Sequence, residues 1–93
     1  MAATITIEVL DGERCRVVVA EGASRTTHDV GVSEAYWAKL TDRQVSVEHL
    51  VRRSFEFLLE REPKESILRT FDLPVIGRYF PEYERDIRRR LGR

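Results

Sequence analysis

The first third of the chain alternates polar with apolar side chains, which is the pattern of half-buried β-strands. In residues 4–10, isoleucine and valine occupy every second position, and residues 14–20 and 26–32 are two further runs of strand-like composition. Asp11-Gly12 and residues 21–24 separate the runs with residue types that favour turns. The pattern therefore predicts three strands that pair as an antiparallel meander.

From Ser33 onward, the apolar residues recur at helical spacing. Ser33 suits the N-cap of a short helix that includes Leu40, and Ser46 suits the N-cap of a second helix over residues 47–61. In the second helix, valine, leucine and phenylalanine recur three and four positions apart. The pattern predicts two consecutive helices joined by the polar linker 41–44.

Two prolines punctuate the rest of the chain. Pro63 fits the first turn of a helix over residues 64–71, and Pro81 fits the first turn of a last helix over residues 82–91. Residues 75–80 form a short apolar segment between them. Because strands precede helices, we predict an α+β fold in which a three-stranded antiparallel meander is followed by a cluster of three to four helices packed on one face of the sheet.

The length of 93 residues fits one domain with one hydrophobic core. The composition is 42% hydrophobic and 34% charged, which is typical of compact folds and not of disordered chains. We expect residues 1–93 to form a single domain, with the β meander in residues 1–32 and the helices in residues 33–93.

The second helix carries an apolar arc over about half of its circumference, because Phe57 and Leu59 flank the main stripe. Packing against one sheet needs a narrower stripe, so another element or another molecule should cover the flanks. Aromatic side chains, which are enriched at protein interfaces, gather around Pro81. The alternative is that Phe80 and Tyr83 pack the last helix onto the rest of the chain. The candidate interaction surface comprises Trp37, Phe57, Leu59, Tyr79 and Tyr83.

The charges of the chain balance, with 16 Lys and Arg against 16 Asp and Glu. Dedicated nucleic-acid modules are usually basic overall, so binding to nucleic acid would need a local patch of arginines. Most arginines of the helical part alternate with acidic residues, which is also typical of a solvated helix face. The candidate nucleic-acid contacts are Arg52, Arg53, Arg85, Arg88 and Arg89.

Cys15, His28 and His49 are the only cysteine and histidine residues. A structural zinc site usually needs four such ligands at short spacing, so we predict no metal site and no cofactor. Cys15 and His28 could form a nucleophilic pair on neighbouring strands, although a thiol in a strand also packs as a small apolar group. The chain contains no glycine-rich phosphate loop. We therefore predict no catalytic residues and no enzyme.

The order of strand, short helix, turn and second helix over residues 26–61 contains the segment Ser-Val-Glu-His-Leu-Val-Arg-Arg-Ser at residues 46–54. In this order and in this segment, the chain resembles the ribbon-helix-helix family of DNA-binding regulators and antitoxins. The resemblance implies that the strand pairs with its dimer mate and enters the major groove. It further implies inward side chains at Val30 and Val32 and DNA-facing positions at Thr27, Asp29 and Gly31.

Two sequence features bear on the compartment. Residues 1–10 lack the continuous apolar run of a signal peptide, and no stretch approaches the ~20 apolar residues that span a bilayer. A single cysteine cannot form an intrachain disulfide, which is common in small secreted domains. We expect a cytoplasmic protein without membrane association.

The sequence alone does not determine a function. We expect a small non-catalytic protein-interaction or regulatory domain that associates with itself as a homodimer or with another protein. A nucleic-acid-binding regulator or antitoxin is the first alternative, and a small enzyme is the second.

Overall fold

The computed structural model describes two stretches of the chain, residues 3–11 and 13–92. Within them, one sheet holds the strands β1 (Thr4–Val9), β2 (Arg14–Glu21), β3 (Ser24–Gly31) and β4 (Thr70–Asp72), in this spatial order. The antiparallel pairing of β1 with β2 and of β2 with β3 confirms the predicted meander. The turn predicted at Asp11-Gly12 includes Gly12, which lies outside the described residues.

The fourth strand replaces part of a predicted helix. In place of a helix over residues 64–71, the chain forms the 3-10 helix η1 (Lys64–Ser66) and then β4, which lies parallel to β3. The Asp29 backbone N–H donates to the Arg69 carbonyl at 2.7 Å. Such bonds satisfy the backbone in an extended conformation, and they come from a strand that is distant in the sequence. The predictions of a helix here and of a three-stranded sheet are therefore wrong.

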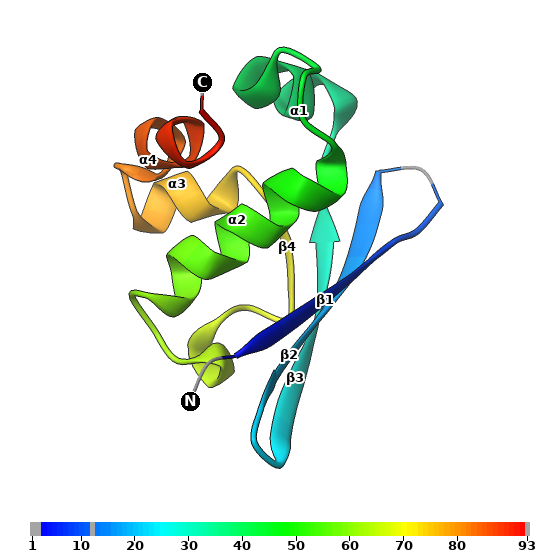
Figure 1. The fold of residues 1–93 in the computed structure, drawn as a ribbon, viewed down its shortest axis with the longest axis vertical. Helices are drawn as coiled ribbons and strands as arrows, with labels where there is room; N and C mark the ends of the chain where they lie inside the picture. The colour runs from blue at the N-terminus through cyan, green and yellow to red at the C-terminus, as the bar shows by residue number, and fades with distance from the viewer. Residues whose placement is uncertain (1–2, 12, 93) are drawn as a thin grey trace.

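The described residues also form four α-helices, which lie on one side of the sheet (Figure 1): α1 (Glu34–Thr41), α2 (Val47–Leu59), α3 (Val75–Tyr79) and α4 (Tyr83–Arg90). Both predicted serine caps are confirmed, because the Ser33 and Ser46 hydroxyls each accept a backbone N–H of the first helical turn at 3.1 Å. α2 packs against β1, and α4 packs against α2. Within the described ranges, no helix combines the length and the apolar character that a membrane crossing requires.

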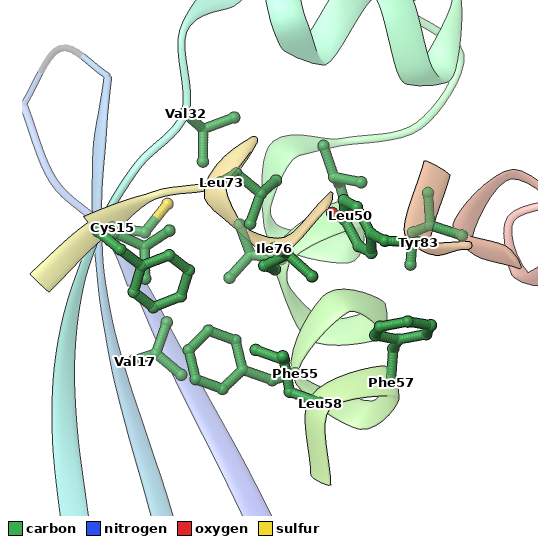
Figure 2. Close-up of a cluster of buried hydrophobic side chains, with 14 of the residues drawn as sticks. Cys15, Val17, Val32, Leu50, Phe55, Phe57, Leu58, Leu73, Ile76 and Tyr83 are labelled. Atoms are coloured by element: carbon green, nitrogen blue, oxygen red, sulfur yellow. The ribbon is translucent and has the colours of Figure 1, made fainter. Parts of the chain in front are cut away.

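The core lies between the inner face of the sheet and the helices (Figure 2). On β2, Cys15 and Val17 are buried while the intervening Arg16 is exposed, so one face of the sheet is apolar and the other meets solvent. Phe55 of α2 lies opposite Val17, and Leu73 lies between the end of the sheet and the helices. This arrangement confirms the predicted α+β class.

Candidate interaction surface

Two of the predicted contact residues, Phe57 and Tyr83, lie in the core, each with 0% of its surface exposed. Their ring centres are 5.3 Å apart in an edge-to-face contact, and the Tyr83 hydroxyl lies 2.7 Å from the Ser54 hydroxyl. α4 therefore covers this flank of α2, as Figure 2 shows for Tyr83 and Phe57. The prediction that these two residues form an exposed surface is wrong, because the chain's own last helix encloses them.

Arginines close the outer side of the Phe57 ring. The Arg61 guanidinium lies 3.6 Å from the ring centre and pairs with Glu82 at 3.2 Å. Arg90 lies 5.6 Å from the same ring and pairs with Glu60 at 2.6 Å, and the hydrogen bonds to Glu60 raise the pKa of Arg90. These charge-assisted bonds tie α4 to the end of α2, so Phe57 needs no second molecule to cover it.

Trp37 and Leu59 are half-buried and pack against the core. The Trp37 indole N–H donates to the Val45 carbonyl at 2.6 Å, and the Arg43 guanidinium lies 5.5 Å from its ring. Trp37 thus holds the connection between α1 and α2 in place. Neither Trp37 nor Leu59 is a freely exposed contact residue.

Among the five predicted contact residues, Tyr79 alone is exposed, with 66% of its surface accessible. It borders a shallow groove of about 30 Å³ between α3 and the segment that leads from η1 into β4. Leu68, on that segment, is 46% exposed. In the described part of the chain, Val9 is the only other large apolar side chain that is exposed to this degree. The groove is lined by Ile67, Leu68, Phe71, Val75, Ile76 and Tyr79.

The groove is built on well-anchored elements. The His28 Nδ1 lies 2.8 Å from the Leu68 carbonyl, and we assign Nδ1 as the donor because a carbonyl can only accept. Phe71 packs against Phe55 of the core with ring centres 6.2 Å apart. On α3, Val75 and Tyr79 are one helical turn apart and therefore lie on the same face. The exposed side chains of Leu68 and Tyr79 therefore lie on backbone segments that are packed against the core.

Leu68 is a surface residue that the sequence pattern did not reveal, and the half-buried Val75 borders the same groove. In the helix predicted over residues 64–71, the spacing of Ile67, Leu68 and Phe71 would place Leu68 on the apolar side. In the structure, the extended segment before β4 leaves Leu68 exposed instead. A sequence signal for the strand did exist, since residues 70–73 alternate polar with apolar side chains.

Two exposed arginines lie beside the groove. Arg69 follows Leu68 in the sequence and Arg78 precedes Tyr79, and neither forms an ion pair within 4.0 Å of a described carboxylate, although the Arg69 charge contributes to lowering the pKa of Glu65. The nearby carboxylates already have partners: Glu65 pairs with Lys64 at 2.7 Å, and Asp72 lies 3.8 Å from Arg14. The apolar groove is therefore flanked by two available cations. We call Leu68, Val75 and Tyr79 together with Arg69 and Arg78 the β4–α3 surface.

A larger hollow of about 300 Å³ lies where the ends of β3 and β4 meet the start of α1. Its polar groups are engaged within the chain. The Glu13 carboxylate accepts the Glu34 backbone N–H at 2.8 Å, and Arg14 pairs with Asp29 at 2.6 Å. The Ser33 hydroxyl serves as the α1 N-cap. These contacts join the sheet to α1 and engage the Glu13 and Arg14 side chains within the chain.

Three of the predicted nucleic-acid contacts bond within the chain: Arg52 to the Ile5 carbonyl at 2.7 Å, Arg53 to Glu56 at 2.7 Å and Arg88 to the Lys39 carbonyl at 3.2 Å. Arg85 and Arg89 are exposed and have no ion pair among the described residues. They lie one turn apart on α4. The structure therefore leaves fewer free arginines than the sequence pattern had indicated.

Cys15 and His28 do not form a nucleophilic pair. Both are buried, and the two His28 nitrogens are bonded to the Leu68 carbonyl and, at 2.7 Å, to the Thr26 hydroxyl. Burial raises the pKa of the Cys15 thiol and lowers the pKa of His28, so the thiol and the imidazole are both held neutral. Among the described residues, no group of three or more His, Cys, Asp or Glu side chains could hold a metal ion.

The region that resembles ribbon-helix-helix regulators spans β3, α1 and α2. Val30 and Val32 are buried and Thr27 and Asp29 are exposed, whereas Gly31 is buried. β3 pairs with β2 along one edge, and β4 covers residues 29–31 of its other edge, so the chain's own strands occupy one edge fully and the other in part. The resemblance stays a prediction. No family model, curated protein or solved structure matches the chain.

Proposed function

We propose that the chain is a non-catalytic protein-interaction domain and that a partner protein docks on the β4–α3 surface. The observation that carries the proposal is the grouping of Leu68 and Tyr79, at 46% and 66% exposure, over one groove. Exposed apolar side chains are usually scattered, and a group of them beside a groove marks an interaction site. Tyrosine at such a site is a frequent source of binding energy.

Charge favours a different protein over a second copy. In a symmetric dimer, the same patch on each subunit meets across the two-fold axis. Such a dimer would bring the four arginines of the two copies, Arg69 and Arg78 of each, into one interface, and like charges gathered at an interface oppose association. A partner with an apolar side chain for the groove and carboxylates for the arginines avoids this repulsion.

The apolar contact alone supports a weak to moderate interaction. Complete burial of a leucine-sized side chain contributes about 1.5–3 kcal/mol, and the groove offers Leu68 and Tyr79 for such burial. The cost of association consumes part of this gain. We therefore expect a transient partner and not an obligate subunit.

Selection from a random peptide display library tests the proposal, because it samples many partner sequences at once and does not require the partner to be identified. The affinity of the peptides enriched on the wild-type chain is then measured for the wild type, for the double variant Leu68→Ser/Tyr79→Ser and for the variant Val9→Ser. Val9 is the matched control, since it is 53% exposed and lies on β1, outside the groove. We expect the double substitution to weaken binding by about tenfold or more and Val9→Ser to leave it unchanged.

Peptides that bind the double variant as tightly as the wild type would place the interaction elsewhere and contradict the proposal. A selection that enriches no peptide contradicts it as well. Sedimentation of the wild-type chain tests whether a second copy of the chain occupies the groove. A dimer that dissociates in the double variant would show that it does, and this result would contradict the proposal of a different partner protein.

A further inference from the structure

We infer that the partner segment is extended and acidic, and that it pairs with the open edge of β4 as a fifth strand while one of its apolar side chains packs over the groove. This inference rests on the proposed function. It specifies the conformation and the charge of the segment that the β4–α3 surface recognises.

The backbone of β4 has one side free. In the parallel pair with β3, the Arg69 carbonyl accepts from Asp29, and the Leu73 N–H donates to the Gly31 carbonyl at 2.8 Å. The alternation of a parallel ladder then directs the N–H and C=O of Thr70 and Asp72 away from β3. Within the described residues, no hydrogen bond outside the ladder engages these four groups. They are available to a further strand.

The opposite edge of the sheet, at β1, is partly engaged by α2. At β1, the Arg52 guanidinium of α2 donates to the Ile5 carbonyl at 2.7 Å, and α2 packs beside the strand. A charged side chain over an edge is a common means of preventing strand addition. No side chain of the described residues bonds to the β4 backbone, and β4 is only three residues long, which limits nonspecific pairing. β4 therefore offers an edge that is open to a short segment.

The groove adjoins the open edge. Phe71 is the inward residue of β4 and lines the groove together with Leu68, which precedes the strand, and Val75, which follows it. In an added strand, every second side chain points to the same face as Phe71. One of these side chains would lie over the groove. In strand addition generally, backbone hydrogen bonds supply most of the affinity and a pocket for a side chain supplies the selectivity.

Charge complementarity specifies an acidic segment. Arg69 immediately precedes β4 and Arg78 lies on α3, and neither has an ion pair among the described residues. A carboxylate of the partner would complete a charge-assisted bond with either one. Phosphates would also be attracted, but a nucleic acid supplies neither a β-strand backbone nor an aliphatic side chain. An acidic polypeptide therefore fits the β4–α3 surface better than a nucleic acid does.

The probe is a synthetic peptide that alternates glutamate with valine around one central leucine, and its counterpart has lysine in place of glutamate. Backbone amide hydrogen exchange of the full chain is measured by NMR with and without each peptide. We expect the acidic peptide to slow exchange at the amides of Thr70 and Asp72 by about tenfold or more. The Ile7 amide on β1 is the internal control, and its exchange should not change.

Charge-reversal variants test the role of the two arginines. Arg69→Glu/Arg78→Glu should weaken binding of the acidic peptide by about tenfold or more, because two charge-assisted contacts are replaced by repulsion. Arg85→Glu/Arg89→Glu on α4 is the matched control: it changes the net charge equally at two exposed, unpaired arginines, and it should leave binding nearly unchanged. Unaltered core amide signals verify that both variants fold.

Each contrary result identifies what is wrong. If peptides bind the groove while exchange at Thr70 and Asp72 stays the same, strand addition is wrong and the proposed function stands. Equal binding of the lysine peptide overturns the acidic preference, and so does an oligothymidylate that binds and is lost in the Arg69/Arg78 variant. If the acidic peptide fails to bind while library peptides bind through Leu68 and Tyr79, the inference fails independently of the proposed function.

Discussion

The Tyr83 hydroxyl lies 2.7 Å from the Ser54 hydroxyl inside the contact between α4 and α2, where both residues are fully buried. Ser54 also donates to the Leu50 carbonyl at 2.8 Å, so its oxygen is free to accept the Tyr83 proton. Burial raises the pKa of Tyr83, which keeps the phenol protonated as the donor. This bond gives the last helix a defined position on the rest of the chain.

Removal of either hydroxyl should destabilise the chain. We expect Tyr83→Phe to cost about 1 kcal/mol, because the remaining Ser54 hydroxyl keeps its bond to Leu50. Ser54→Ala should cost about 1–3 kcal/mol, because it leaves the Tyr83 hydroxyl buried without a partner. The free energy of unfolding in urea measures both effects. In the double variant, the loss should be smaller than the sum of the single losses, and strictly additive losses would show that the two hydroxyls are not coupled.

The Arg61 side chain should contribute more than an ordinary surface arginine. It lies 3.6 Å from the Phe57 ring centre and pairs with two carboxylates of the α4 region, with only 24% of the side chain exposed. We expect Arg61→Ala to lower the free energy of unfolding by about 1–2 kcal/mol. Arg43→Ala is the control, since Arg43 lies over Trp37 at 5.5 Å and its side chain is 58% exposed. Its loss should stay below about 0.5 kcal/mol, and equal losses would refute a special role of Arg61.

His28 should make stability depend on pH. Burial lowers its pKa in the folded chain below the ordinary value of 6.5, so the unfolded chain binds the proton first as the pH falls. Stability is therefore retained above 6.5 and decreases below it, by up to about 1.4 kcal/mol per pH unit, until the folded pKa is reached. Urea unfolding between pH 7.5 and pH 5 measures this slope.

A pair of asparagine variants isolates the histidine contribution. His28→Asn should flatten the pH slope, because it removes the titrating group while its amide can still donate to the Leu68 carbonyl. His49→Asn should keep the slope of the wild type, since His49 lies on the partly exposed side of α2. If His28→Asn retains the full slope, another group is responsible for the pH dependence.

Cys15 should be unreactive in the folded chain. The thiol is 1% exposed, and burial raises its pKa, so both access and the thiolate fraction are low. We expect iodoacetamide at neutral pH to modify the native chain about a hundredfold more slowly than the urea-unfolded chain. Alkylation of the native chain at the rate of an accessible thiol would contradict this expectation and would favour the enzyme alternative.

Local patterns were sufficient for most of the secondary structure. The alternation in residues 4–10 predicted β1, and the serines at 33 and 46 predicted the starts of two helices. These features depend on side chains a few positions apart and on a cap that bonds its own helix. The sequence therefore determined them independently of the remaining fold.

The candidate surface could not be derived in the same way. Tyr79 was predicted as a contact residue, but Phe57 was assigned with it because an apolar helix flank looks the same whether its cover is α4 or another molecule. Tyr83 was assigned because an aromatic cluster has the same composition at an interface and in a core. Only the packed structure distinguishes these covers. Here the chain's own helix encloses Phe57.

The sequence by itself determined the α+β class, the meander, the helix caps and the balance of charge. The tertiary structure decided the extended form of Thr70–Asp72, because its backbone bonds come from β3, and it decided that Leu68 lies outside while Tyr83 lies inside. Strand pairing and burial are set by contacts between residues that are far apart in the chain. A local pattern contains the preference for such contacts but not the identity of the partner.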